Sequence, residues 1–233
     1  MRRWPLISSA AAVLVAAGCG GSASNTRVVQ TPAPPTTTTA LVKSPPPKPR
    51  PRPPLPPANN GSLPQTPQRP RAGTPAFNAE MAALWAGVKT NSVHAALPAF
   101  FPAAAYAQVK AISDPRGDWQ DRLVGSYAQD LAAAHNLLGG GAGSAQLVEV
   151  DVPSQYAHLV PPGSCDNSLS YWEVPNSRVV YRENGELKSF GIASMISWRG
   201  YWYVVHLGSV TGGGGTVDDP ETGKGTAQAS STC

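Results

Sequence analysis

A sharp change in composition near residue 75 constrains this chain more than any other feature. Most of its 25 prolines lie between Gly20 and Pro75, in a segment that also holds a run of threonines and almost no large apolar residues. Such a segment buries too little apolar surface to offset the entropy lost on folding. We therefore expect residues 20–75 to be disordered, and residues 76–233 to contain one domain with a single core.

The charge of the chain is divided at the same point. All 14 acidic residues follow residue 75, together with half of the 18 Lys and Arg residues, so the expected domain is net negative and the linker is basic. A nucleic-acid-binding domain would carry its positive charge on the folded part, so we exclude that class. The basic linker is either a solvated spacer or a segment that touches anionic lipid headgroups or wall polymers.

The first residues are typical of an export signal. Arg2 and Arg3 precede an apolar stretch, Leu6 to Ala17, which is too short to remain in a bilayer as a spanning helix. The following Gly18-Cys19 completes a motif that resembles the lipobox of bacterial, actinobacterial-type lipoproteins, in which the cysteine is acylated. The resemblance implies that Cys19 is a lipidation site carrying chains such as palmitate. It also implies a protein held at the extracytoplasmic face of the cell membrane, within the cell envelope.

These features divide the chain into four parts. Residues 1–18 are predicted to be a lipoprotein signal peptide. Residues 19–75 comprise the lipidated cysteine and a disordered, basic, Pro/Thr-rich linker. Residues 76–210 form an α+β domain, and residues 211–233 form a Gly/Ser-rich tail that a disulfide holds at its C-terminal end.

Two further cysteines, Cys165 and Cys233, are left as a pair in an oxidising compartment. We expect an intramolecular disulfide between them, with an intermolecular one as the alternative. We expect no metal site, because the four histidines show no ligand spacing with either cysteine. We expect no cofactor either, since the sequence holds no motif that would bind one.

Helical periodicity dominates the first half of the expected domain. Thr74-Pro75 is a typical helix start, with threonine as the N-cap. A short helix over 93–97 and another over 102–112 follow. Asp118 is predicted to cap the longest helix, which ends at the glycine run 139–141.

Alternation replaces this periodicity after the glycine run. Asn184-Gly185 and Arg199-Gly200 are typical two-residue hairpin turns. The expected strands are Gln146–Val152, Tyr171–Val174, Arg178–Arg182, Leu187–Trp198 and Tyr201–Leu207. Helices followed by an antiparallel meander predict an α+β fold, in which helices pack on one face of a bent sheet.

The last hairpin predicts a register in which both faces of the sheet are apolar. The expected pairs are Trp198–Tyr201, Ser197–Trp202, Ile196–Tyr203, Met195–Val204, Ser194–Val205 and Ala193–His206. A sheet with one solvated face would carry more polar residues on that face. The side that carries Trp202 is therefore expected to line a pocket, to form a self-association surface such as that of a homodimer, or to be covered by the tail.

The order of these elements resembles the NTF2-like superfamily, in which N-terminal helices lie against a strongly curved antiparallel sheet and form a cone. The closing segment Ile196 to Val205 carries the resemblance through its W-x-G-x-W hairpin. Cystatin-like sheets are the nearest alternative. The superfamily includes isomerase-like enzymes, dehydratases and non-catalytic binding domains, and no residue pair here matches an enzymatic motif of the family. We therefore assign no catalytic residue.

Three neighbouring residues are the candidate contacts for a ligand or partner: Trp202, Tyr203 and His206. Trp202 offers a stacking surface, and His206 could act as a general base with Tyr203, Asp151 or His158. A purely structural histidine at the end of a strand is the alternative.

The leading hypothesis is a non-enzymatic surface lipoprotein whose domain binds a cell-wall polymer, a protein partner or a lipid-like ligand. The alternatives are an NTF2-like enzyme with a histidine-containing pocket, and a structural module of the cell envelope.

Overall fold

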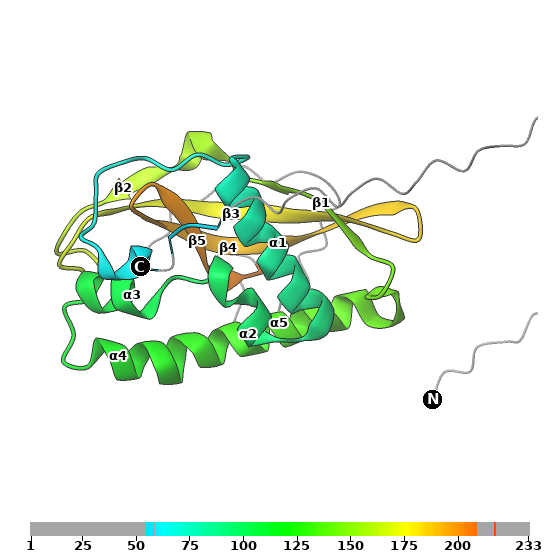
Figure 1. Ribbon diagram of the computed structural model, residues 1–233, viewed down its shortest axis with the longest axis horizontal. Helices are drawn as coiled ribbons and strands as arrows, with labels where there is room; N and C mark the ends of the chain where they lie inside the picture. Colours follow the sequence, from blue (N-terminus) through cyan, green and yellow to red (C-terminus); the bar gives the residue numbers. More distant parts are fainter. Residues whose placement is uncertain (1–54, 58, 209–216, 218–233) are drawn as a thin grey trace, which may run out of the picture. The chain divides into compact units, whose positions relative to one another are not determined.

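The computed structural model describes residues 55–57, 59–208 and 217, and the helices precede the strands in it (Figure 1). The main helices are α1 (Pro75–Thr90), α2 (Val93–Ala96), α3 (Ala103–Val109), α4 (Pro115–Asp118) and α5 (Val124–Leu138). Short helical turns are η1 (Asn60–Ser62), η2 (Leu97–Ala99), η3 (Trp119–Leu123), η4 (Gly139–Gly141) and η5 (Ser154–Tyr156). The strands are β1 (Gln146–Asp151), β2 (His158–Val160), β3 (Tyr171–Glu183), β4 (Glu186–Trp198) and β5 (Tyr201–Leu207). Within the described residues, no helix has both the length and the apolar character that a membrane span requires.

The five strands form one antiparallel sheet in the order β1-β3-β4-β5, and β2 pairs with the start of β3. The α1 helix crosses the sheet, and α5 runs along its β5 edge (Figure 1). The predicted α+β fold, with helices before an antiparallel sheet, is confirmed. The sheet differs from the prediction in two respects. The two strands expected over residues 171–182 are a single strand, in which Asn176 has a φ of +55°, and the short strand β2 was not expected.

Helix α1 begins as the sequence predicts. The Thr74 side chain accepts a hydrogen bond from the Phe77 N–H at 3.2 Å, and Pro75 occupies the first turn. The helix ends at Asn91, which adopts the left-handed conformation with φ +48°. One face of α1 is buried against the sheet by Phe77, Met81, Leu84, Trp85 and Val88.

The predicted start of the longest helix is wrong. Asp114, not Asp118, provides the N-cap, and its carboxylate accepts the Gly117 N–H at 2.9 Å. Pro115 in the first turn fixes the helical φ there, so the helix starts four residues earlier than expected. The Asp118 carboxylate instead pairs with Arg122 one turn along, within a continuous helical run from α4 through η3 to α5.

The register of the β4–β5 hairpin matches the prediction near the turn and departs from it further out. Arg199 and Gly200 both have positive φ, as the turn type requires. The four pairs confirmed are Trp198–Tyr201, Ser197–Trp202, Ile196–Tyr203 and Met195–Val204. Beyond them the register shifts, so that Ser194 faces His206 and not Val205, and the predicted Ala193–His206 pair does not form. Such a bulge re-aims side chains, and here it turns His206 toward a pocket.

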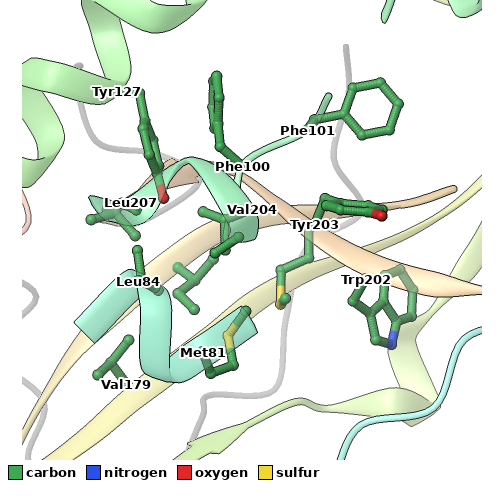
Figure 2. Packing of buried hydrophobic residues seen from close by; sticks show 14 of the residues in the cluster. Met81, Leu84, Phe100, Phe101, Tyr127, Val179, Trp202, Tyr203, Val204 and Leu207 are labelled. Atoms are coloured by element: carbon green, nitrogen blue, oxygen red, sulfur yellow. The ribbon is translucent and has the colours of Figure 1, made fainter. Parts of the chain in front are cut away.

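The core lies between the sheet and helices α1 and α5. Figure 2 shows Met81 and Leu84 of α1 among the strand residues Val179 and Val204, with Phe100 beside Tyr127 of α5. The rings of Phe100 and Tyr127 stack with their centroids 4.0 Å apart. This packing covers the side of the sheet that carries Trp202, for which the sequence allowed three alternatives.

The predicted boundary between linker and domain is also wrong. Residues 59–74, here called the strap, lie against the β4–β5 hairpin although we expected them to be disordered. The buried Asn60 side chain donates from Nδ2 to the Tyr203 hydroxyl at 2.8 Å. The Trp198 Nε1–H donates to the Asn60 carbonyl at 2.9 Å. We expected disorder because the segment has few apolar residues, but hydrogen bonds of its polar groups hold it in place.

Further contacts continue along the strap. The Gln65 side chain donates to the Ser197 carbonyl at 3.1 Å and accepts from the Arg199 N–H at 2.7 Å. The Trp172 Nε1–H donates to the Pro67 carbonyl at 3.2 Å, and the Arg69 guanidinium lies 5.0 Å from the Trp172 ring centre. The folded part of the chain therefore begins well before residue 76.

Replacing Asn60 by alanine tests the contribution of the strap. The change leaves the buried Tyr203 hydroxyl without its partner, and we expect it to lower the free energy of unfolding by about 1–3 kcal/mol. Asn59→Ala is the matched control, because Asn59 is exposed and its side chain makes no capping bond. Urea denaturation measures both variants. Equal stability of the two would show that the bond between Asn60 and Tyr203 adds nothing to the stability of the fold.

Candidate functional site

The three candidate contact residues follow one another on β5 but line three separate hollows. Trp202 and Tyr203 are buried, at 1% and 3% exposure, whereas the His206 side chain is 38% exposed. Trp202 faces a hollow beside the N-terminus of α1, and Tyr203 faces one beneath the strap. Helix α1 covers the side of the sheet that carries Trp202 (Figure 1), and Trp202 lines a hollow there, which is the first of the three alternatives expected for this side.

The hollow at His206, here called the His206 pocket, has a volume of about 360 Å³. It lies between two residues of the helical half, Lys110 just after α3 and Arg122 in η3, and the strands β3, β4 and β5. Ile196 and Val205 give part of its lining an apolar character. Its size falls within the range usual for small-molecule sites.

Two basic side chains line the pocket from the helical side. The Lys110 ammonium donates to the Cys165 carbonyl at 2.7 Å. Burial lowers the pKa of Lys110, and the nearby positive charge of Arg122 lowers it further. Arg122 donates to both carboxylate oxygens of Asp118 at 2.7 Å, which lowers the pKa of that carboxyl to about 2. The bond to Asp118 raises the pKa of Arg122 and holds this arginine in place, so its positive charge is fixed at this wall.

A carboxylate lines the pocket from the sheet side. Glu173 on β3 is 5% exposed. The Ser194 hydroxyl on β4 donates to its Oε1 at 2.9 Å. The His158 Nε2 lies 4.0 Å from its Oε2. Glu173 can thus accept hydrogen bonds from ligand hydroxyl groups while Ser194 and His158 orient it.

His206 is held by an acidic residue outside the set considered from the sequence. Asp130 on α5 is 1% exposed, and its Oδ2 lies 3.5 Å from His206 Nδ1. The same oxygen accepts the Leu207 N–H at 3.0 Å. A carboxylate at one ring nitrogen orients the ring and sets its tautomer. Of the three partners proposed from the sequence, none is recorded within hydrogen-bond distance of His206 among the described residues.

Cys165 lies in the loop between β2 and β3 and borders the same pocket. It is disulfide-bonded. The other two cysteines, Cys19 and Cys233, lie outside the described residues. The pairing with Cys233, the lipidation of Cys19 and the tail over 211–233 all remain predictions.

A second hollow, here called the Tyr203 hollow, has a volume of about 480 Å³ and is mainly apolar. It lies between the strap and the segment that joins α2 to α3, with Leu97 and Trp119 in its lining. The Tyr203 hydroxyl and the Trp119 N–H are both already hydrogen-bonded, to Asn60 and to the Phe101 carbonyl. The Tyr203 hollow therefore presents few polar groups that could select a ligand.

Sequence reasoning missed four residues of the His206 pocket: Lys110, Arg122, Glu173 and Ser194. They come from three elements and the segment after α3, and they form no local motif. The one available signal was the hairpin register, which places Glu173 opposite Ile196 when it is extended from β4 to β3. Within the described residues, no group of three or more His, Cys, Asp or Glu residues lies close enough together to bind a metal ion.

No protein-family model matches this chain, and no match is found among curated proteins or among solved structures. The fold and the His206 pocket by themselves define an α+β domain with a pocket that has basic residues on one side and a glutamate on the other.

Proposed function

We propose that this chain is a lipid-anchored lipoprotein of the extracytoplasmic membrane face, and that its domain binds an acidic sugar of the cell envelope without transforming it. Cys19 is the anchor, and the Pro-rich linker separates the domain from the membrane. A strongly curved, NTF2-like arrangement of the sheet belongs to the same proposal. The sequence motifs at Cys19 and over residues 196–205 support these parts.

The placement of opposite charges on two walls of one pocket carries the choice of ligand. Lys110 and Arg122 suit a carboxylate, and the Glu173 carboxylate suits hydroxyl donors. Apolar side chains such as Ile196 can contact the C–H faces of a sugar ring. A sugar that carries a carboxylate matches all three features, whereas a lipid-like ligand would form no hydrogen bonds with the charged groups of the two walls.

Binding of glucuronate tests this proposal. We expect Lys110→Met to weaken glucuronate binding about tenfold or more, because the pocket loses half of its basic wall. Lys89→Met is the matched control, since Lys89 likewise donates to a loop carbonyl, that of Gly143, but lies outside the pocket. Its binding should stay within about twofold of the wild type. Isothermal titration calorimetry gives both affinities, with glucose as the uncharged comparison ligand.

Two results would contradict the proposal. One is equal binding of glucose and glucuronate, which would show that the basic wall does not select the ligand. The other is equal loss of binding in Lys89→Met and Lys110→Met, which would place the effect outside the pocket.

The contact between His206 and the buried Asp130 favours a second candidate, an enzyme that uses His206 as a general base. The two candidates differ in the fate of bound glucuronate. The binding function leaves its proton NMR spectrum unchanged during long incubation with the protein. New resonances that His206→Gln abolishes would establish the enzymatic candidate instead.

A further inference from the structure

A buried carboxyl on α1 has no hydrogen-bond partner within the described part of the protein. Glu80 is fully buried, and neither of its side-chain oxygens has a partner there. The indole N–H of Trp202 is also buried without a partner in that part. Both residues line a third hollow of about 390 Å³, here called the Glu80 hollow.

Leaving such groups unpaired is costly. A buried polar group without a hydrogen bond loses its hydration and gains nothing in return. The two residues belong to different elements, α1 and β5, and both line the same hollow. An arrangement of this kind destabilises the free protein, and a ligand that pairs with both groups would relieve it.

The mouth of the Glu80 hollow is positively charged, unlike its inner end. Two arginines line it, Arg71 from the strap and Arg199 from the β4–β5 turn, and the Arg199 guanidinium also donates to the Pro64 carbonyl. It also includes Thr74 and Pro75, where α1 starts. A helix N-terminus and two arginines both favour a negative charge at this point.

We propose that the Glu80 hollow is a second ligand site, which takes a small molecule with an uncharged amide or hydroxyl at its inner end and an anionic group at its outer end. The inner end pairs with Glu80 and Trp202. The outer end pairs with Arg71 and Arg199. This inference does not depend on the function proposed for the His206 pocket.

The ionisation of Glu80 decides the chemistry of the inner end. Burial raises the pKa of Glu80 to about 9, so the group is a neutral carboxylic acid at pH 7. It then offers one O–H donor and one carbonyl acceptor, and Trp202 offers a second donor. An amide or a hydroxyl matches this set. An amine is disfavoured, because its positive charge would meet the two arginines at the mouth.

Succinamate is the probe, since it has an amide at one end and a carboxylate at the other. The full chain carrying Cys19→Ser, which cannot be acylated, is titrated and followed through the Trp202 indole N–H resonance in a proton–nitrogen NMR spectrum. We expect this resonance to shift and to saturate. Propionate, which lacks the amide, should bind about tenfold more weakly or worse.

Variants at Glu80 separate binding from folding. Glu80→Leu keeps the volume and removes both polar atoms, so it should abolish the succinamate-dependent shift in a protein that is folded. Glu80→Gln preserves a neutral donor and acceptor, so it should bind within about tenfold of the wild type. A Trp202 resonance that succinamate does not move, up to the solubility limit, would overturn the proposal. So would a shift of the same size in Glu80→Leu.

Discussion

Glu80→Leu is expected to stabilise the protein by about 3 kcal/mol or more at pH 7, although it alters a fully buried position. Most changes in a core destabilise. Here the wild-type side chain is a carboxyl without a partner among the described residues, and leucine fills a similar volume without polar atoms. Urea denaturation measures the difference. A loss of stability would show that Glu80 has a partner in solution.

The stability gained by this variant is expected to grow with pH. The pKa of Glu80 is raised from 4.5 to about 9 in the folded state, so folding favours the protonated form. The stability that protonation of Glu80 contributes is fully present below the pKa of the unfolded state, and it is lost as the pH rises through the pKa of the folded state. Between these values the wild type loses up to about 1.4 kcal/mol per pH unit through this group.

The free energy of unfolding, measured by urea denaturation between pH 5 and pH 9, should therefore fall with pH in the wild type and change less in Glu80→Leu. Glu186→Gln serves as the control, because Glu186 is exposed at the start of β4 and should leave the pH dependence unchanged. Parallel curves for the wild type and Glu80→Leu would mean that Glu80 is ionised in the folded protein at neutral pH.

The disulfide at Cys165 carries the second large effect. A bridge to Cys233 closes a loop of about 69 residues, and its removal by Cys233→Ser is expected to cost about 4 kcal/mol. The bond should also make the wild-type monomer lighter than its reduced form by the mass of a pair of hydrogen atoms. Intact mass under non-reducing conditions and urea denaturation measure these two quantities.

The oligomeric state distinguishes a Cys165–Cys233 bridge within one chain from a disulfide between two chains. A covalent dimer in the non-reducing mass spectrum would show that Cys165 pairs between chains. A monomer whose bridge survives in Cys233→Ser would assign the partner to Cys19, and would contradict lipidation at that residue.

Local signals in the sequence predicted most of the folded elements. The Thr74-Pro75 start and the Arg199-Gly200 turn depend on residues next to each other in the chain, and both formed as expected. The strap could not be predicted in this way. Its anchor, Asn60, becomes an ordered residue only because Trp198 and Tyr203 lie beside it, far away in the sequence.

The same limit applies to the sites. Strand alternation placed Tyr203 on the opposite face of the sheet from Trp202 and His206, but the sequence held no reason for Trp202 and His206 to line different hollows. The bulge in β4–β5 pairing, together with the strap, creates that separation. Asp130, the partner of His206, lies on helix α5, far from β5 in the sequence, so no sequence spacing could indicate the contact.

The location of bound glucuronate is the most direct test of the proposed function. Intermolecular NOEs between the sugar ring protons and the protein would report it. The account predicts NOEs to the Ile196 methyl groups and the Tyr171 ring, which both line the His206 pocket. NOEs to Leu97 in the Tyr203 hollow, with none to Ile196, would contradict it.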